Sequence, residues 1–186
     1  MRRIVNYFRS AYLCYFSQPA TQRWLLRAIR KHRCRRIVEL GMGTGVRACL
    51  MVEQARLAAR QPPHYTGVDL FESRPASTCA GLSLREAHRR LKATGAHVKF
   101  IPGDPLAALS RAANDLVGTD LLVISADQDA QSLEAAWYYV PRLLHDRSLV
   151  VIEAAGEATG QTILRPLDRA EIDRLATAAA SRRRAA

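Results

Sequence analysis

The chain has 186 residues, of which 48% are hydrophobic and 24% are charged. These fractions are those of an ordinary globular domain and exclude a wholly disordered, collagen-like or disulfide-scaffold protein. The formal net charge of +11 is unevenly distributed, because residues 1–36 contain ten Lys or Arg and no Asp or Glu. Residues 37–186 contain 18 basic and 17 acidic residues. The body is therefore nearly neutral, which excludes a uniformly basic protein that coats nucleic acid.

The cysteines and the hydropathy pattern indicate the compartment. No apolar run approaches the roughly 20 residues that cross a bilayer, so we expect no transmembrane segment. Asn6, Arg9 and Ser10 interrupt the first apolar stretch, which argues against a signal peptide. The cysteines are isolated from one another and lack metal-ligand spacing: Cys14, Cys34, Cys49 and Cys79. These features predict a cytoplasmic protein with free thiols.

Two amphipathic helices are predicted before the first strand, over residues 4–16 and about 20–32. In the first, the apolar residues at helical spacing are Ile4, Phe8, Ala11, Tyr12 and Tyr15. In the second they are Trp24, Leu25, Ala28 and Ile29, opposite an arginine-rich face. Such stripes usually pack on the protein's own core. The alternatives are an interfacial helix, a homodimer contact, or an RNA-docking surface on which aromatic and arginine side chains stack.

From residue 36 onward the pattern alternates between strand and helix. Strands are predicted over residues 36–40, 65–69, 97–101, 120–125 and 148–153. Helices are predicted over residues 46–60, 82–94, 105–113 and 131–144, with a further strand over 162–167 and a helix over 170–180. This alternation predicts a Rossmann-like, doubly wound α/β fold, in which helices cover both faces of a mostly parallel sheet. We expect a basic helical extension over residues 1–35, one domain over 36–180 and a disordered basic tail over 181–186.

A glycine-rich turn is the most informative motif in the chain. Gly41, Gly43 and Gly45 follow the first strand in a GxGxG pattern, and Glu39 stands two residues before the first glycine. Glycines at such a turn allow positive φ and let a ligand approach the backbone. A phosphate-binding turn and a purely structural turn are the alternatives. Phosphate is disfavoured because the charge of Glu39 would repel it.

The motif resembles the first motif of class I S-adenosylmethionine-dependent methyltransferases. The resemblance implies that Glu39 and the three glycines hold the methionine end of S-adenosylmethionine, with Glu39 acting on its amino group directly or through water. It covers roughly residues 36–153.

Two later acids agree with this resemblance. Asp69 ends the second strand, where an acid can accept hydrogen bonds from both ribose hydroxyls, and Leu70 and Phe71 would flank the adenine. Asp104 follows the third strand and, by the same resemblance, would accept an N–H from the adenine. Asp104 also precedes Pro105, which predicts a helix N-cap, and the two roles are compatible.

The segment after the fourth strand, residues 125–129, is similar to that of cation-dependent O-methyltransferases of the caffeoyl-CoA and catechol type. In that family, aspartates and an asparagine bind a divalent cation. Ser125, Glu153 and Ala154 stand where three of those ligands would be. We therefore predict no metal site. Asp127 does match an acid of the pattern, and it is a general base, a substrate-positioning residue or a helix N-cap.

The predicted function is O-methylation of a small molecule with S-adenosylmethionine as the methyl donor and S-adenosylhomocysteine as the product. Asp127 is the candidate catalytic residue. Transfer from a sulfonium depends mainly on alignment of the acceptor and exclusion of water, so a missing metal does not abolish it. The alternatives are a donor-binding protein without transfer activity and an RNA methyltransferase that docks through its basic N-terminus.

Overall fold

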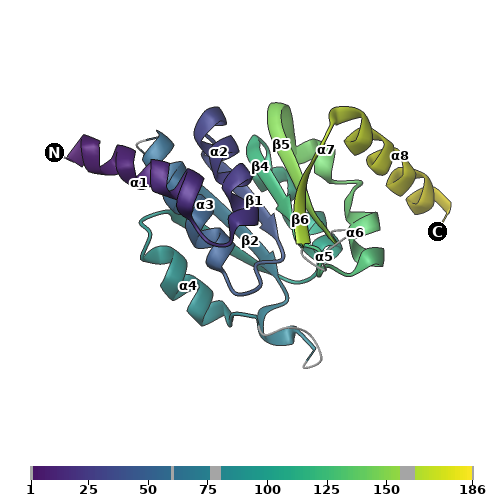
Figure 1. Cartoon of the computed structure of the whole chain (residues 1–186). Helices are drawn as coiled ribbons and strands as arrows, with labels where there is room; N and C mark the ends of the chain where they lie inside the picture. The colour runs from purple at the N-terminus through teal and green to yellow at the C-terminus, as the bar shows by residue number, and fades with distance from the viewer. Residues whose placement is uncertain (1, 60, 76–80, 156–161, 186) are drawn as a thin grey trace.

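The computed structural model describes residues 2–59, 61–75, 81–155 and 162–185. Six strands form one sheet in the order β3-β2-β1-β4-β5-β6 (Figure 1). They are β1 (Arg36–Leu40), β2 (His64–Asp69), β3 (His97–Pro102), β4 (Thr119–Ile124), β5 (Leu144–Ala155) and β6 (Thr162–Leu167). The first five strands are parallel, and β6 runs antiparallel to β5. The structure confirms the predicted doubly wound fold.

Helices lie on both faces of this sheet. They are α1 (Arg2–Phe16), α2 (Arg23–His32), α3 (Val46–Ala59), α4 (Leu84–Lys92), α5 (Pro105–Ala112), α6 (Ala130–Ala136), α7 (Val140–Leu143) and α8 (Arg169–Ala185). Short 3-10 turns are η1 (Ala20–Gln22), η2 (Phe71–Ser73) and η3 (Ala113–Leu116). Among the described residues, no helix combines the length and the apolar character that crossing a bilayer requires.

The two faces of the sheet divide the hydrophobic core, because neighbouring side chains in a strand point to opposite sides. Ile37 and Leu121 lie in the cluster with α2, α3 and α4, whereas Val38 and Leu122 lie in the cluster with α5, α7 and α8. All four side chains are almost completely buried. This burial on both faces accounts for the nearly continuous hydrophobic runs of the central strands.

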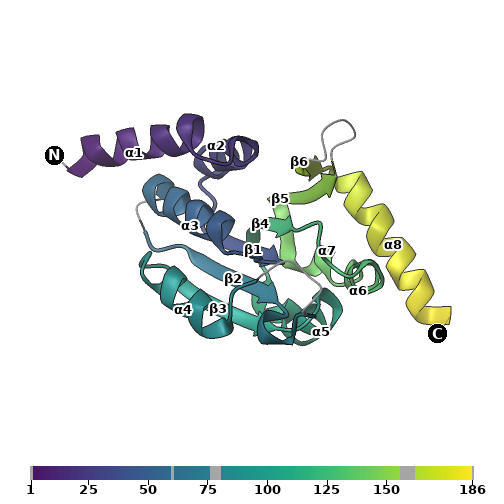
Figure 2. The ribbon, with the colours of Figure 1, turned by 60° about the horizontal axis from the view of Figure 1, so that its bottom comes forward.

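The N-terminal helices form a layer on the α3 side of the sheet. Figure 2 shows α1 and α2 outside α3, with α1 reaching away from the body. Leu25 and Ile29 of the predicted stripe are buried in the core together with Leu26, whereas Trp24 and Ala28 are only partly buried. The predicted stripe of α1 behaves differently, since Ile4, Phe8, Tyr12 and Tyr15 are exposed. Leu13 and Cys14, on the opposite side of α1, are the buried residues.

Two segments differ from the predicted boundaries. A single helix was predicted over residues 131–144, but the chain forms α6 and then α7, which begins next to Pro141. Proline lacks the N–H that a continuous helix would need there.

The tail over residues 181–186, predicted to be disordered, is helical as far as Ala185. Arg182 forms an ion pair with Glu134, and Arg183 donates to the hydroxyl of Tyr139 at 2.8 Å. These contacts fix the end of α8 against α6 and the turn after it. In this structure residues 181–185 are the last residues of α8.

Candidate functional site

The carboxyl ends of β1 and β4 meet where the strand order reverses, which is where doubly wound sheets bind ligands. The glycine turn follows β1, and residues 125–129 follow β4. Two backbone hydrogen bonds join the glycine turn to β2 and the segment after β4 to β1. The N–H of Gly41 donates to the carbonyl of Val68 at 2.8 Å, and that of Ser125 donates to the carbonyl of Leu40 at 2.8 Å.

The three glycines of the turn all adopt positive φ, at +85°, +53° and +73° for Gly41, Gly43 and Gly45. They differ in their surroundings. A Cβ at Gly41 would lie 2.2 Å from Nε2 of Gln128, and one at Gly45 would lie 2.5 Å from Cδ1 of Leu82. A Cβ at Gly43 would meet nothing within 4 Å. Packing therefore excludes a side chain at Gly41, where Cβ of Ser125 would also lie 2.8 Å away, whereas at Gly45 only the end of the Leu82 side chain would have to move and Gly43 faces open space.

Glu39 is completely buried behind the turn, and its carboxylate is already paired. The Nε of Arg47 donates to it at 2.6 Å, and the hydroxyl of Tyr65 donates to its second oxygen. Burial raises the pKa of Glu39, and Arg47 and Tyr65 act in the opposite direction. Both oxygens of Glu39 therefore accept hydrogen bonds from side chains in this arrangement.

Arg47 continues this buried network to the end of β5. It donates to Glu153 at 2.9 Å and to the carbonyl of Gly41 at 3.1 Å. Burial acts to lower the pKa of Arg47, but attraction to Glu39 and then to Glu153 outweighs it, so the pKa is raised. Arg47 is one of the site residues that sequence analysis missed, because one of its partners lies 106 positions away in the chain.

Glu153 occupies the position where the cation-dependent family has a metal ligand. Besides Arg47, its carboxylate accepts from the hydroxyl of Ser125 at 2.8 Å. Burial acts to raise its pKa, but the charge and hydrogen bonds of Arg47, with Ser125, hold the pKa below its ordinary value. Within the described residues, no group of three or more His, Cys, Asp or Glu side chains is arranged to hold a metal ion.

Asp69 is buried at the end of β2 and faces the glycine turn. Its carboxylate accepts from the backbone N–H of Met42 at 2.7 Å, and both of its oxygens lie 2.7 Å from Nη2 of Arg74. Arg74 also donates to Asp127 at 3.1 Å. The Nε of Arg74 is buried without a hydrogen-bond partner among the described residues. An unsatisfied buried donor costs free energy, so this placement of Arg74 is not fully stabilised.

A small cavity of about 50 Å³ brings four of the predicted site residues together: Asp69, Leu70, Asp104 and Asp127. Arg74 and Gln128 also line it. Phe71, expected beside the adenine, is instead buried and packs edge to face on Phe100, with ring centroids 5.8 Å apart. The structure therefore assembles the acids that follow β2, β3 and β4, and leaves Glu39 and Phe71 in the interior.

The helix caps explain part of this acidic cluster. Asp104 caps α5 by accepting from the N–H of Ala107 at 3.0 Å, and it also binds the hydroxyl of Ser132. Both hydrogen bonds use Oδ1 of Asp104. Its Oδ2 is therefore the oxygen that could accept a hydrogen bond from a ligand in the cavity. Burial acts to raise the pKa of Asp104, but these hydrogen bonds lower it. Asp129, not Asp127, caps α6, so the helix cap, one of the three alternatives for Asp127, is not its role.

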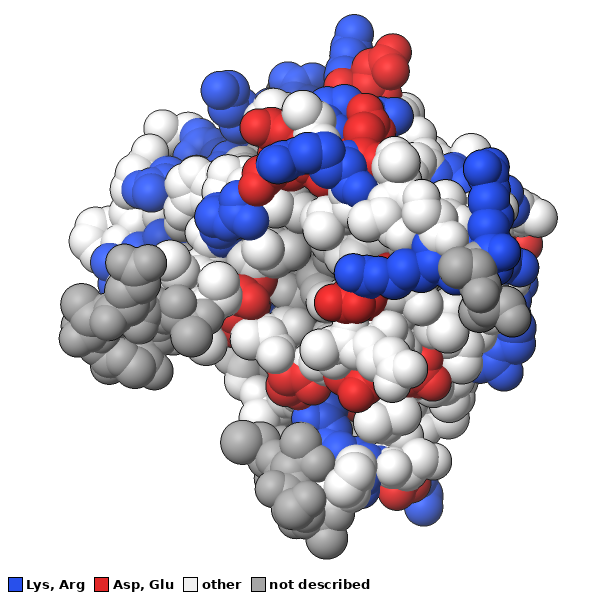
Figure 3. Space-filling view, turned by 90° about the vertical axis from the view of Figure 1, so that its right-hand side faces the viewer, with Lys and Arg blue, Asp and Glu red and all other residues white. Residues whose placement is uncertain are grey.

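A larger hollow of about 690 Å³ adjoins the small cavity, and Gln128 lines both. Its wall is mostly apolar and comes from α6, the end of β6 and α8: Leu133, Trp137, Leu167, Leu175 and Ala178. Ser125 and Glu153 line it on the sheet side. On the face of the molecule drawn in Figure 3, acidic and basic side chains are interspersed. The volume lies within the roughly 300–1,000 Å³ of small-molecule sites.

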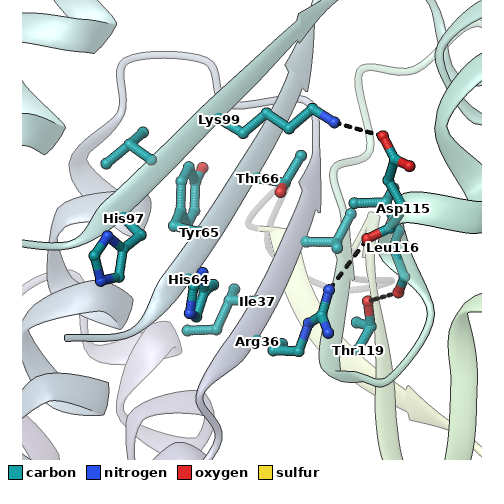
Figure 4. Close-up of a pocket in the computed structure, with 12 residues that line it drawn as sticks. Arg36, Ile37, His64, Tyr65, Thr66, His97, Lys99, Asp115, Leu116 and Thr119 are labelled. Atoms are coloured by element: carbon teal, nitrogen blue, oxygen red, sulfur yellow. Dashed lines mark hydrogen bonds and ion pairs between the residues drawn. The ribbon is translucent and has the colours of Figure 1, made fainter. Parts of the chain in front are cut away.

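Another hollow, of about 300 Å³, lies at the opposite ends of the strands (Figure 4). The rings of His64 and His97 stack there at 4.8 Å, and Lys99 forms an ion pair with Asp115 at 2.9 Å. Burial, His97 and the arginines at 35 and 36 lower the pKa of His64. This hollow contains none of the predicted site residues, and ligands of doubly wound sheets bind at the other end.

No protein-family model and no curated protein sequence matches the chain. Solved structures do. The O-methyltransferase TomG of Streptomyces achromogenes, in complex with S-adenosylmethionine, is 16% identical, with a TM-score of 0.56 over 81% of this chain and 65% of TomG. An O-methyltransferase of Bacillus cereus in complex with S-adenosylhomocysteine is 16% identical, with a TM-score of 0.55 over 82% and 63% of the two chains.

A putative caffeoyl-CoA O-methyltransferase of Staphylococcus aureus is 14% identical, with a TM-score of 0.53 over 88% of this chain and 72% of that one. The chain therefore has the fold of the class I S-adenosylmethionine-dependent methyltransferases. It spans slightly less than two thirds of the length of the Streptomyces and Bacillus enzymes.

Proposed function

We propose that the chain is an S-adenosylmethionine-dependent methyltransferase that O-methylates a small molecule. One observation carries the proposal. Asp69, Leu70, Asp104 and Asp127 surround one cavity beside the glycine turn, at the switch point of a fold shared with O-methyltransferases. Residues from three separate strand ends converge there, as binding of a nucleoside across the sheet requires.

The residues fit such a donor once Arg74 leaves Asp69. At about 50 Å³ the cavity is well below the roughly 300 Å³ at which small-molecule sites begin. Arg74 occupies both oxygens of Asp69, and these are the acceptors that ribose hydroxyls need. The Nε of Arg74 has no hydrogen-bond partner among the described residues, so release of Arg74 would expose this donor to water, and Gly43 leaves open space on the turn.

Each residue then has a proposed role. Asp69 would accept from the ribose hydroxyls, and Leu70 and Oδ2 of Asp104 would contact the adenine. The turn with Gly41, Gly43 and Gly45 would lie against the methionine end. Glu39 would act from behind the turn, by fixing Arg47 and through it the carbonyl of Gly41.

The larger hollow is the proposed acceptor site. S-adenosylmethionine supplies a methyl group that is already activated, so the chain's own work is to align an acceptor and exclude water. Gln128 separates the two cavities, and Trp137 and Leu133 offer an apolar wall to the acceptor. We propose that Asp127 positions the acceptor or removes its proton. We also propose a cytoplasmic location, since Cys14, Cys34 and Cys49 are free.

Calorimetry with S-adenosylmethionine and S-adenosylhomocysteine tests the donor site. We expect binding by the wild type and at least a roughly tenfold loss in Asp69→Asn, because hydrogen bonds to a charged group contribute about 1.5–3 kcal/mol. We expect tighter binding in Arg74→Met, because the side chain that competes for Asp69 is removed. Asp146→Asn, on an exposed residue, is the matched control. Absence of binding, or a preference for NAD, would overturn the proposal.

Transfer is tested separately, with donor labelled in the methyl group and incubated with small-molecule extracts. Label should enter a small molecule with the wild type. Asp127→Asn should slow this transfer by a larger factor than it weakens binding of S-adenosylhomocysteine, because the proposed role of Asp127 is toward the acceptor. Binding of the donor with no labelled product in any extract would indicate a donor-binding protein without transfer activity.

A further inference from the structure

Helix α1 presents its apolar side chains to solvent. Six of them, each 51–66% exposed, form the α1 apolar face: Ile4, Val5, Phe8, Tyr12, Tyr15 and Phe16. They recur at helical spacing along one side of the helix. Figures 1 and 2 show α1 at the edge of the molecule, with no other element over its outer side.

The opposite side of α1 makes the contacts with the body, and these are partly polar. Leu13 and Cys14 are buried there, together with Ser10, whose hydroxyl accepts from Gln54 at 2.9 Å. Arg9 forms an ion pair with Glu53 of α3 at 2.7 Å. Helix α1 thus exposes more large apolar side chains than it buries, unlike a usual surface helix, whose apolar residues face the core. Contiguous exposed apolar surface of this kind marks an interaction site.

A basic hollow lies between the body and the inner side of the same helix, where Asn6, Tyr7 and Ser10 line it. Its volume is about 1120 Å³, and four arginines from α2, the segment after it and α3 line it: Arg30, Arg33, Arg35 and Arg56. None of the four forms an ion pair with a carboxylate among the described residues. Tyr7 joins the hollow to the α1 apolar face, because it lines the hollow and its ring packs on Phe8 at 6.0 Å.

We propose that α1 and the arginine hollow bind the surface of an anionic phospholipid bilayer. The α1 apolar face would lie at the boundary between headgroups and acyl chains, and anionic headgroups at the edge of this contact would pair with the arginines of the hollow, reached past Tyr7. Aromatic side chains favour this interface, and arginine pairs with phosphate through two parallel hydrogen bonds.

The charge and the apolar surface of this region favour an anionic bilayer over a second copy of the chain or a nucleic acid. Residues 1–36 contain ten basic residues and no acidic ones, so a second copy packed on this face would bring like charges together. The phosphates of a nucleic acid could pair with the arginines, but a nucleic acid would not bury the aliphatic side chains of Ile4 and Val5, which are about 60% exposed. An anionic bilayer satisfies both the apolar face and the basic hollow.

Cosedimentation of the full chain with vesicles tests the proposal. We expect binding to phosphatidylcholine vesicles that contain about 30 mol% phosphatidylserine, and at least a roughly tenfold weaker binding to phosphatidylcholine alone. The double variant Ile4→Glu, Phe8→Glu should lose at least about tenfold. Its control, Val117→Glu with Ile163→Glu, makes the same chemical change at two side chains that are each 49% exposed.

A second pair of variants tests the hollow. Arg33→Gln with Arg56→Gln should weaken binding to the anionic vesicles about tenfold or more, whereas Arg85→Gln with Arg89→Gln on α4 should not. Thermal unfolding checks that all variants are folded.

Three results would overturn the proposal. The first is no vesicle binding, or equal binding by the Ile4→Glu, Phe8→Glu variant. The second is a dimer in sedimentation, without vesicle binding, that this variant abolishes, since a second copy then covers the face. The third is binding to single-stranded RNA in place of vesicles, lost in the Arg33→Gln, Arg56→Gln variant.

Discussion

Arg47 is the buried cation on which the ends of two strands depend. It holds the carboxylates of Glu39 on β1 and Glu153 on β5 at 2.6 Å and 2.9 Å, and it also binds the carbonyl of Gly41. The Arg47 and Glu39 side chains are 9% and 0% exposed. A buried ion that loses its partner strongly destabilises the folded state. The position of the glycine turn is therefore tied to this one guanidinium.

We predict that Arg47→Met lowers the free energy of unfolding by about 3–5 kcal/mol, because it leaves two carboxylates without their cation. Urea unfolding followed by circular dichroism measures this difference. Arg89→Met is the control, since Arg89 is 73% exposed and its change should stay within about 0.5 kcal/mol. Equal effects of the two substitutions would show that the buried network does not stabilise the fold.

Glu153 gives the same network a pH dependence. Its pKa is lower in the folded chain than the ordinary 4.5, so its contribution to stability is present above pH 4.5 and is lost as the pH falls through the folded-state pKa. We predict that between pH 7 and strongly acidic pH the wild type loses more stability than Glu153→Gln. The two unfolding curves should converge at low pH. A constant difference between them at all pH values would contradict this assignment.

The residues that pair with the predicted acids could not be found from the sequence. Glu39 and Asp69 stand beside a recognisable turn, so their positions at the strand ends were predictable. Arg47 and Arg74 lie in stretches without a motif, and their pairing with Glu153 and Asp127 is visible only after the strand ends meet. The positions of the acidic residues could therefore be predicted from the sequence, but those of the arginines that pair with them could not.

At the scale of elements, the turn between β1 and α3 combines backbone strain with packing. We predict that Gly43→Ala and Gly95→Ala each lower stability by about 1–2 kcal/mol, because both have positive φ and open space around the new Cβ. Gly41→Ala should cost more, since its Cβ would also collide with Gln128 and with Ser125 at 2.8 Å. Unfolding in urea ranks the three variants. Equal losses would mean that residues 125–128 do not pack on the turn.

The elements themselves were largely predictable, because buried parallel strands and amphipathic helices have clear periodicities. Two features were not. The periodicity of α1 shows that an apolar stripe exists, but it cannot show whether the body covers that stripe, and here Leu13 and Cys14 are covered instead. The order of α8 depends on contacts of Arg182 and Arg183 with α6 and Tyr139, which lie more than 40 positions earlier in the chain.

At the scale of the whole molecule, the proposed activities occupy different regions. The small cavity and the apolar hollow adjoin at the carboxyl ends of the strands, separated by Gln128. The exposed apolar helix and its arginine hollow belong to the N-terminal layer outside α3. A surface that holds the protein on a bilayer would thus leave the donor and acceptor cavities to be tested independently of it.

The most direct test of the donor site is a crystal structure of the chain with S-adenosylhomocysteine. We predict ribose hydroxyls within about 3 Å of the Asp69 carboxylate, adenine beside Leu70 and Asp104, and Arg74 turned away from Asp69. A structure in which Arg74 still covers Asp69 and the nucleoside lies elsewhere, or is absent at saturating concentration, would contradict the account.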